Sequence, residues 1–298
     1  MSLQPIEKPA DEAWTVGKII DWTTGHLRKH GSDTPRLEAE ILLAHARRCP
    51  RIQLYVQYNE PLSDDERQVM RELVRRRAQS EPVAYLVGHR EFFGLEFRVT
   101  PDVLIPRPET ETLVLQVVTL AKQQPRSRVL DVGTGSACIA ASVAVNVPDA
   151  IVTATDLHQR ALDVARENAV RHGVAERIRF LEGDLFAPLP FDEQFEIIAS
   201  NPPYVADGEM ETLPADVRLH EPAHALRAGP QGLDVISRMI AAAPAHLAPG
   251  GTLLLEIAPE QAAGVRAMLE QSGAFDPPRT IKDSFGQDRV IAARGAPS

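Results

Sequence analysis

The first eighty residues carry apolar side chains at the spacing of amphipathic helices. Apolar positions recur every three or four residues in three runs, which predict helices over residues 14–29, 36–48 and 64–79. The third run begins at Ser63-Asp64-Asp65-Glu66, which has the pattern of a capping box. These runs predict a small all-α region, and the preceding residues 1–13 are expected to form a tail.

The pattern changes after about residue 88. Two β-rich runs between Glu91 and Val99 are separated by Gly94 and predict a hairpin. From Arg128 onward, short apolar runs alternate with helical patterns. The predicted strands cover residues 129–132, 151–155, 178–181, 195–200, 252–257 and 289–293, and the predicted helices cover 139–145, 158–171, 232–247 and 261–271. This alternation predicts an α/β fold with a doubly wound, mostly parallel sheet.

The change of pattern also predicts the domain organisation. We expect a helical domain over residues 1–87, a β-hairpin and linker over 88–108, and a larger α/β domain over 109–298. A chain of 298 residues exceeds one average domain of ~100–200 residues, so this division is reasonable. A helical domain of ~80 residues is expected to need a neighbour for stability.

The composition of the chain indicates in which cellular compartment the protein works. No apolar run approaches the ~18 residues of a membrane span, and the N-terminus lacks the apolar core of a signal peptide. The two cysteines, Cys49 and Cys138, are too few for a disulfide framework and have no metal-ligand spacing. We therefore expect a cytoplasmic protein with no metal and no membrane partner.

The net charge of −9 is unevenly distributed. Residues 1–100 contain 15 basic and 15 acidic residues, so the whole excess lies in residues 101–298. An acidic domain repels a phosphate backbone unless a local patch intervenes. The charge counts against a nucleic-acid substrate without excluding one.

A glycine-containing turn follows the first predicted strand of the α/β domain. In the segment Asp131 to Cys138, glycines allow a tight turn and a close approach of a ligand to the next helix. Asp156 ends the second strand, where a carboxylate can accept hydrogen bonds from both hydroxyls of a ribose. These features suit any adenosine-containing ligand, including NAD.

Two features favour S-adenosylmethionine (SAM) over NAD. A dinucleotide fingerprint starting at Gly133 needs a glycine at the position of Cys138, and Asp131 suits the ammonium of a methionine moiety, directly or through the adjacent loop. Asp184 and Leu185 follow the third strand and offer an acceptor and an apolar wall for adenine. Asp156 and Asp184 are each equally consistent with helix caps or turns when taken alone. The predicted cofactor residues are Asp131, Gly133, Thr134, Gly135, Ser136, Ala137, Asp156, Asp184, Leu185 and Asn201.

The tetrapeptide Asn201-Pro202-Pro203-Tyr204 follows the fourth predicted strand. Such a sequence is also typical of a plain turn. Two prolines hold the backbone stiff and leave carbonyl oxygens as acceptors only, while Asn201 adds an amide oxygen and Tyr204 an aromatic face. This combination suits a planar –NH2 donor, such as a carboxamide or the amine of adenine.

Two further segments are candidates for the walls of a pocket. In Leu104 to Glu111, two prolines flank Arg107 just before a helix that starts near Glu109, which indicates a rigid wall or a stiff linker. The connection from Val205 to Gly232 is long for a compact domain and acidic in its first half. We interpret it as part of a substrate wall, with an ordinary solvated loop as the alternative.

With these segments in place, the chain closely resembles the PrmC/HemK family, the glutamine methyltransferases that modify peptide chain release factors. The segments that carry the resemblance are 35–43, 104–111, 131–137, 201–204, 221–222 and 286–290. The resemblance implies a class I SAM-dependent methyltransferase fold, which is Rossmann-like. It also implies methyl transfer from SAM to the glutamine of the Gly-Gly-Gln loop in class 1 release factors. The helical domain would recognise that partner.

The resemblance assigns roles to individual residues. Gly133 to Ala137, Asp156 and Leu185 would contact SAM, and Asn201-Pro202-Pro203-Tyr204 would hold the glutamine. We expect the Asn201 side chain and the Pro202 carbonyl to accept the two amide N–H bonds, with Tyr204 packed on the amide plane and no general base. Ala137 stands where the family usually has a third glycine, and its methyl group could crowd the methionine end of SAM.

The expected partners are a class 1 release factor and SAM, with no direct contact to nucleic acid and with a monomeric enzyme. Three alternatives remain open at this point: a glutamine methyltransferase acting on a ribosomal protein, an adenine N6 methyltransferase acting on nucleic acid, and a cofactor-binding module without activity.

Overall fold

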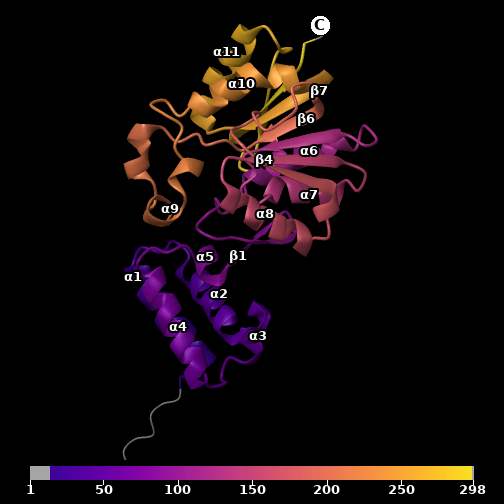
Figure 1. The fold of residues 1–298 in the computed structure, drawn as a ribbon. Helices are drawn as coiled ribbons and strands as arrows, with labels where there is room; N and C mark the ends of the chain where they lie inside the picture. Colours follow the sequence, from indigo (N-terminus) through magenta and orange to yellow (C-terminus); the bar gives the residue numbers. More distant parts are fainter. Residues whose placement is uncertain (1–13, 297–298) are drawn as a thin grey trace, which may run out of the picture. The chain divides into compact units, whose positions relative to one another are not determined.

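The computed structural model describes residues 14–296, so the tail expected at residues 1–13 lies outside the described range. The chain divides after Val87 into two compact units, each with its own hydrophobic core (Figure 1). The two units are described separately.

The first unit is all-helical. It contains α1 (Val16–Lys29), α2 (Pro35–Arg47), α3 (Arg51–Val56), α4 (Asp64–Arg77) and α5 (Val83–Val87). Its core consists of aliphatic side chains from all five helices, including Ile20, Leu42, Leu54, Leu73 and Leu86. The predicted capping box is present, because Ser63 Oγ accepts from Glu66 N while Glu66 Oε2 accepts from Ser63 N. The short helices α3 and α5 were not predicted.

The second unit begins with the predicted hairpin, formed by β1 (His89–Phe92) and β2 (Leu95–Arg98). The buried Asn168 joins the hairpin to the rest of the unit. Its Oδ1 accepts from Arg98 N at 2.7 Å, and its Nδ2 donates to the carbonyl oxygens of Arg98 and Ser136. One amide side chain therefore links the hairpin to the glycine-containing turn.

A seven-stranded sheet forms the centre of this unit, in the order β5-β4-β3-β6-β7-β9-β8. Its strands are β3 (Arg128–Val132), β4 (Ile151–Asp156), β5 (Ile178–Glu182), β6 (Phe195–Ser200), β7 (Leu247–Glu256), β8 (Arg279–Lys282) and β9 (Asp288–Arg294). The first five in this order are parallel, and β9 and β8 are antiparallel additions. The strand order reverses between β3 and β6, and such switch points are where ligands bind in open α/β sheets.

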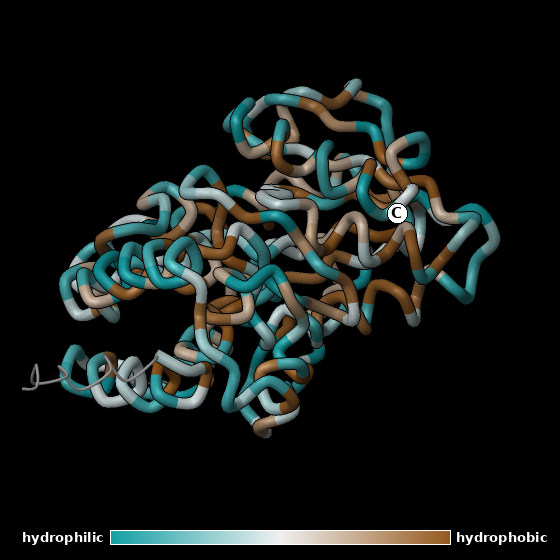
Figure 2. The backbone as a smooth tube through the Cα atoms, turned by 90° about the horizontal axis from the view of Figure 1, so that it is seen from below, coloured by the Kyte–Doolittle hydropathy of each residue, from teal (hydrophilic) through white to brown (hydrophobic). Residues whose placement is uncertain are grey.

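Helices cover both faces of the sheet (Figure 1). The helices α6 (Thr110–Ala121), α7 (Cys138–Asn146) and α8 (Gln159–Arg171) share a core with Val129 and Ile197. The helices α10 (Asp234–His246) and α11 (Ala262–Ser272) share the other core with Leu130 and Ile198. Successive strand residues thus face opposite layers. Along the coiled segments of the backbone tube, hydrophobic and hydrophilic residues are interspersed (Figure 2). The predicted fold class is confirmed.

The long connection after β6 is folded. It contains the 3-10 helices η2 (Asp207–Thr212) and η3 (Ala223–Ala225) and the short α9 (Ala215–His220), while η1 (Ala175–Arg177) and η4 (Pro259–Gln261) lie elsewhere in the unit. Val205, Met210 and Leu226 form a small core of their own, against which Leu104 packs. The connection is therefore an ordered element and not a plain solvated loop.

Candidate active site

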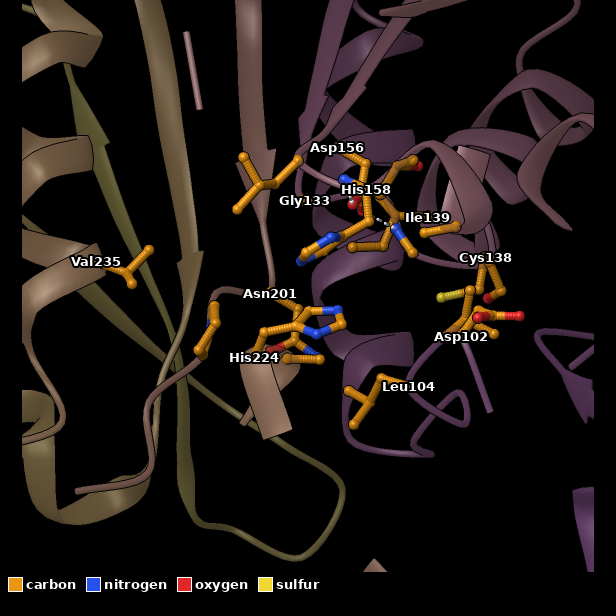
Figure 3. A pocket seen from close by; sticks show the side chains of 18 of the residues that line it. Asp102, Leu104, Gly133, Cys138, Ile139, Asp156, His158, Asn201, His224 and Val235 are labelled. Atoms are coloured by element: carbon orange, nitrogen blue, oxygen red, sulfur yellow. Dashed lines mark hydrogen bonds between the residues drawn. The ribbon is translucent and has the colours of Figure 1, made fainter. Parts of the chain in front are cut away.

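A cavity opens at the switch point, where β3, β4 and β6 end (Figure 3). The predicted residues that line it are Gly133, Thr134, Gly135, Ser136, Asp156, Asp184, Leu185, Asn201 and Pro203. Segments that are far apart in the sequence thus meet in one place. Four predicted site residues, Asp131, Ala137, Pro202 and Tyr204, are not among the residues that line the cavity.

Asp156 holds the glycine-containing turn in place. Its Oδ2 accepts from Gly135 N at 2.9 Å and its Oδ1 accepts from His158 N at 3.0 Å. Each carboxylate oxygen retains lone pairs for a further donor. A Cβ added at Gly133 or Gly135 meets no other atom within 4 Å, so the space above the turn is open. The turn therefore presents backbone to the cavity.

Asp131 is fully buried and cannot contact a ligand directly. Its Oδ2 accepts from Thr134 Oγ1 at 2.6 Å and from Ala140 N at 3.1 Å. Burial raises the pKa of this carboxyl to about 7, against the opposing effect of these two hydrogen bonds. Of the two routes expected for Asp131, the burial of its side chain favours the indirect one, through the turn that it braces.

Ala137 adopts a left-handed conformation, with φ of 61°, at the start of α7. This conformation explains why a glycine suits the position. The side chain of Ala137 is buried in the core beneath the sheet and does not line the cavity. The expected crowding of the methionine end is therefore not supported by the structure.

Asp184 and Leu185 reach the cavity from the segment after β5. Leu185 lines the wall in a left-handed conformation. The carboxylate of Asp184 pairs with the Arg238 guanidinium of α10 at 2.5 Å. An adenine amine would therefore share this carboxylate with an existing cation.

The Asn201 side chain is held from one side only. Its Nδ2 donates to Thr110 Oγ1 at 3.1 Å, and Thr110 is buried at the start of α6. Within the described part of the chain, no hydrogen bond reaches the Asn201 Oδ1 or the Pro202 carbonyl oxygen. Neither of the two acceptors predicted for a –NH2 group is therefore occupied, but only Asn201 lines the cavity, whereas Pro202 is buried and does not line it.

Tyr204 anchors the loop that follows these acceptors. Its ring packs between two hydrophobic clusters, and its carbonyl oxygen accepts from Gln261 Nε2 at 2.9 Å. Gly232 approaches so closely that an added Cβ would lie 2.3 Å from the same oxygen. Burial raises the pKa of Tyr204 to about 12, with a contribution from the nearby Glu256.

Several site residues were not predicted. Glu256 ends β7 with no exposed surface, and burial raises the pKa of its carboxyl to about 7. The rings of His158 and His224 lie 3.7 Å apart between centroids and both line the cavity. The sequence does place Glu256 at the end of a leucine-rich strand, and this position could have marked it as a candidate site residue. No sequence pattern indicates that His158 and His224 lie together.

Arg107 and Glu221 connect the two predicted walls. Glu221 is almost fully buried, and its Oε1 pairs with the Arg107 guanidinium while its Oε2 accepts from Ile105 N. Arg107 and Glu221 belong to two different segments that carry the family resemblance, and this contact joins them.

The described residues also contain no candidate metal cluster and no candidate membrane span. Residues 14–296 contain no group of three or more His, Cys, Asp or Glu side chains suited to a metal ion. None of the helices in that range has the length and apolar character needed to cross a bilayer.

The sheet order, the glycine-containing turn after β3 and the switch-point cavity define a class I methyltransferase fold. Residues 18–88 match the family model of the PrmC N-terminal domain, and residues 110–231 match that of the methyltransferase small domain. A 16S rRNA methyltransferase of T. thermophilus, solved with AdoMet and guanosine, is 21% identical with a TM-score of 0.52. That match covers 70% of this chain and 50% of the other, and it shows the fold alone.

Curated relatives identify the family. The release factor glutamine methyltransferase of Rhodopirellula baltica is 42% identical over 294 residues, which cover 97% of this chain and 99% of the relative. That of Geobacter sulfurreducens is 43% identical over 288 residues, which cover 97% and 99%. The chain belongs to the release factor glutamine methyltransferase family.

Proposed function

We propose that this protein transfers the methyl group of SAM to the side-chain amide nitrogen of the glutamine in the Gly-Gly-Gln loop of class 1 release factors. The proposal includes a cytoplasmic, monomeric enzyme. The observation that carries it is the Asn201 Oδ1, which accepts no hydrogen bond from the described residues and belongs to a side chain that lines the same cavity as the open glycine-containing turn. Full-length similarity to release factor glutamine methyltransferases supports the same substrate.

The residues around the turn fit SAM. Gly133 and Gly135 leave open space above the backbone, and Asp156 has remaining lone pairs for ribose hydroxyls. Leu185 offers an apolar wall for adenine. When bound, SAM supplies an electrophilic methyl group on a sulfonium.

Catalysis in this proposal is mainly positioning. An amide nitrogen is a poor nucleophile because its lone pair is delocalised. If Asn201 Oδ1 and the Pro202 carbonyl accept both N–H bonds, they fix the nitrogen and favour its rotation toward the methyl group. Positioning of this kind can supply up to ~7–11 kcal/mol of the barrier. The nitrogen becomes acidic once methylated, so no base is needed before the transfer.

Mass spectrometry tests this function. The purified protein is incubated with SAM and an intact class 1 release factor, and the Gly-Gly-Gln peptide is analysed before and after. We expect one added methyl group on the glutamine side chain. A release factor with asparagine in place of that glutamine is the matched control and should remain unmodified. Methylation of DNA, RNA or a ribosomal protein in its place would contradict the proposal.

We also propose that the N-terminal helical unit recognises the release factor at a distance from the glutamine. The match of residues 18–88 to the PrmC N-terminal domain supports a role specific to this family. Deleting residues 1–87 should then reduce methylation of the intact release factor more than methylation of a short Gly-Gly-Gln peptide. Equal losses with both substrates would remove the recognition role.

A further inference from the structure

Glu256 is a buried carboxyl group that the mechanism above does not use. Glu256 is the last residue of β7. The residue before it, Leu255, pairs with Ser200 of the parallel strand β6, and Ser200 directly precedes Asn201. Glu256 and Asn201 therefore occupy corresponding positions at the ends of neighbouring strands. Its side chain has no exposed surface, and neither carboxylate oxygen has a partner at hydrogen-bond geometry among the described residues. A buried carboxyl without partners is costly, so its presence at the site requires an explanation.

Thr110 lies between Glu256 and Asn201. It is buried at the start of α6, and its Oγ1 accepts from Asn201 Nδ2 at 3.1 Å. The same hydroxyl lies close enough to Glu256 to lower the pKa of the carboxyl against the effect of burial. A threonine hydroxyl has one proton, and a hydroxyl that accepts from Asn201 has that proton available for Glu256.

We propose that Glu256 is a positioning residue that orients the Asn201 side chain through the Thr110 hydroxyl. This inference rests on the proposed function, because it explains how Asn201 presents an acceptor to the substrate amide.

The orientation follows from the direction of the hydrogen bonds. When Glu256 is ionised, its carboxylate is the acceptor toward which the Thr110 proton turns, and the Thr110 oxygen is left to accept from Asn201 Nδ2, as it does in the structure. The Asn201 Oδ1 then faces the cavity and can accept from the substrate –NH2 group. When Glu256 is protonated, it can donate to Thr110, whose own proton then turns toward Asn201. The amide of Asn201 would reverse and present a donor to a donor, which is unproductive.

The charged groups around Glu256 set where this change occurs. They are Glu109 at the start of α6, Arg107 before it, Arg289 on β9, Tyr204 after β6 and Cys138 on α7. Arg289 and Arg107 favour the ionised carboxyl, whereas burial and Glu109 oppose it, and the resulting pKa is about 7. Turnover should therefore rise as the pH increases through about 7.

The test compares the full-length wild-type enzyme with Glu256→Gln, using an intact release factor at pH 6 to 9. Glutamine cannot ionise, so its effect should not change with pH, and its Nε2 can donate to Thr110 as the protonated acid does. We expect kcat at pH 8 to fall about tenfold, which corresponds to one lost orienting hydrogen bond. The KM for SAM should change less than about twofold, and the rise of kcat through pH 7 should disappear. Glu196→Gln, on the opposite end of β6, is the matched control and should keep the wild-type pH profile.

Variants at Thr110 separate orientation from a general structural effect. Thr110→Val should lower kcat about as much as Glu256→Gln, because both remove the same chain of hydrogen bonds. Thr110→Ser keeps the hydroxyl and should retain most activity. The double variant Thr110→Val with Glu256→Gln should be no slower than either single variant, whereas independent roles would make the losses multiply.

The outcomes distinguish this inference from the proposed function. If the wild-type enzyme does not methylate the glutamine, the proposed function fails and this inference falls with it. If the wild type is active and Glu256→Gln keeps its kcat and pH profile, only the role of Glu256 is overturned. Multiplicative losses in the double variant would overturn it as well.

Discussion

At one end of the cavity, both carboxylate oxygens of Asp156 accept backbone N–H groups, and the turn between Gly133 and Ala137 is fixed before any ligand arrives. At the other end, Asn201 Oδ1 and the Pro202 carbonyl accept no hydrogen bond from the described residues, and the nearby Glu256 oxygens have no partners. The proposed cofactor end is thus fixed by hydrogen bonds within the protein, whereas the proposed substrate end holds polar groups that have no partners among the described residues. In the proposed function, these unpaired acceptors are the groups that bind the reacting amide.

The largest expected effect comes from a substitution at the proposed substrate end. Asn201→Ala removes one acceptor for the substrate amide, and turnover should fall by a factor on the order of 10²–10³. The affinity for SAM, measured by calorimetry, should stay nearly unchanged because the cofactor end is intact. Asn146→Ala, at the end of α7, is the control. Equal losses of turnover and SAM affinity would show that Asn201 has a structural role.

The next largest effect is expected from a substitution at the proposed cofactor end. Asp156→Asn removes a charge and one of the two backbone hydrogen bonds that Asp156 accepts, which come from Gly135 N in the turn and from His158 N. A hydrogen bond to a charged group contributes about 1.5–3 kcal/mol, so the Kd for SAM should rise about 10- to 100-fold. The kcat at saturating SAM should change little. Asp163→Asn, on the exposed side of α8, should leave both values unchanged, and a loss confined to kcat in Asp156→Asn would contradict the comparison.

The pH dependence of stability sharpens the comparison. Burial raises the pKa of Glu256 from 4.5 to about 7, so the folded protein binds this proton more tightly than the unfolded chain does. The free energy of unfolding should therefore decrease as the pH rises from about 4.5 to about 7 and then level off. Glu256→Gln should be more stable than the wild type at pH 8, by on the order of 2 kcal/mol.

Urea unfolding at pH 5 and pH 8 measures this difference. Asp131, whose pKa burial also raises to about 7, contributes in the same direction and leaves part of the pH dependence in the variant. An equal stability difference between wild type and Glu256→Gln at both pH values would contradict a raised pKa at Glu256.

The smallest effect concerns Ala137. Replacing it by glycine relieves a left-handed conformation worth ~1–2 kcal/mol. The change also loses a buried methyl group of ~0.8 kcal/mol and adds ~0.5–1 kcal/mol of backbone entropy cost. Ala137→Gly should therefore alter the free energy of unfolding by less than about 1 kcal/mol and leave SAM affinity unchanged, as the balance of these terms implies. A clear gain in SAM affinity would revive the crowding hypothesis.

The core strands were predictable because buried parallel strands are short, continuous apolar runs. β8 was missed because its four residues include the charged Arg279 and Lys282, which leave too short an apolar pattern to recognise. The start of β7 was assigned to a loop because Pro249 and Gly250 interrupt it. Strand prediction therefore failed where charged residues, proline or glycine break the apolar run.

The candidate site was only partly predictable. The Asn201 loop and the glycine-containing turn carry local patterns, so the sequence indicates them. The partner of Asn201 is 91 residues away, and which hydroxyl reaches it depends on how α6 packs over the sheet. Burial raises the pKa of Asp131 and of Glu256. The sequence does not show which strand ends are buried, so these two pKa shifts could not be predicted from it.

The ion pair between Arg107 and Glu221 joins two segments that are far apart in the sequence. Glu221 also accepts from the backbone of Ile105, so the stretch before α6 and the folded connection after β6 share one buried carboxylate. Separating the two segments would leave this buried negative charge without its counterion, which is costly. The shared carboxylate therefore fastens the two segments to each other.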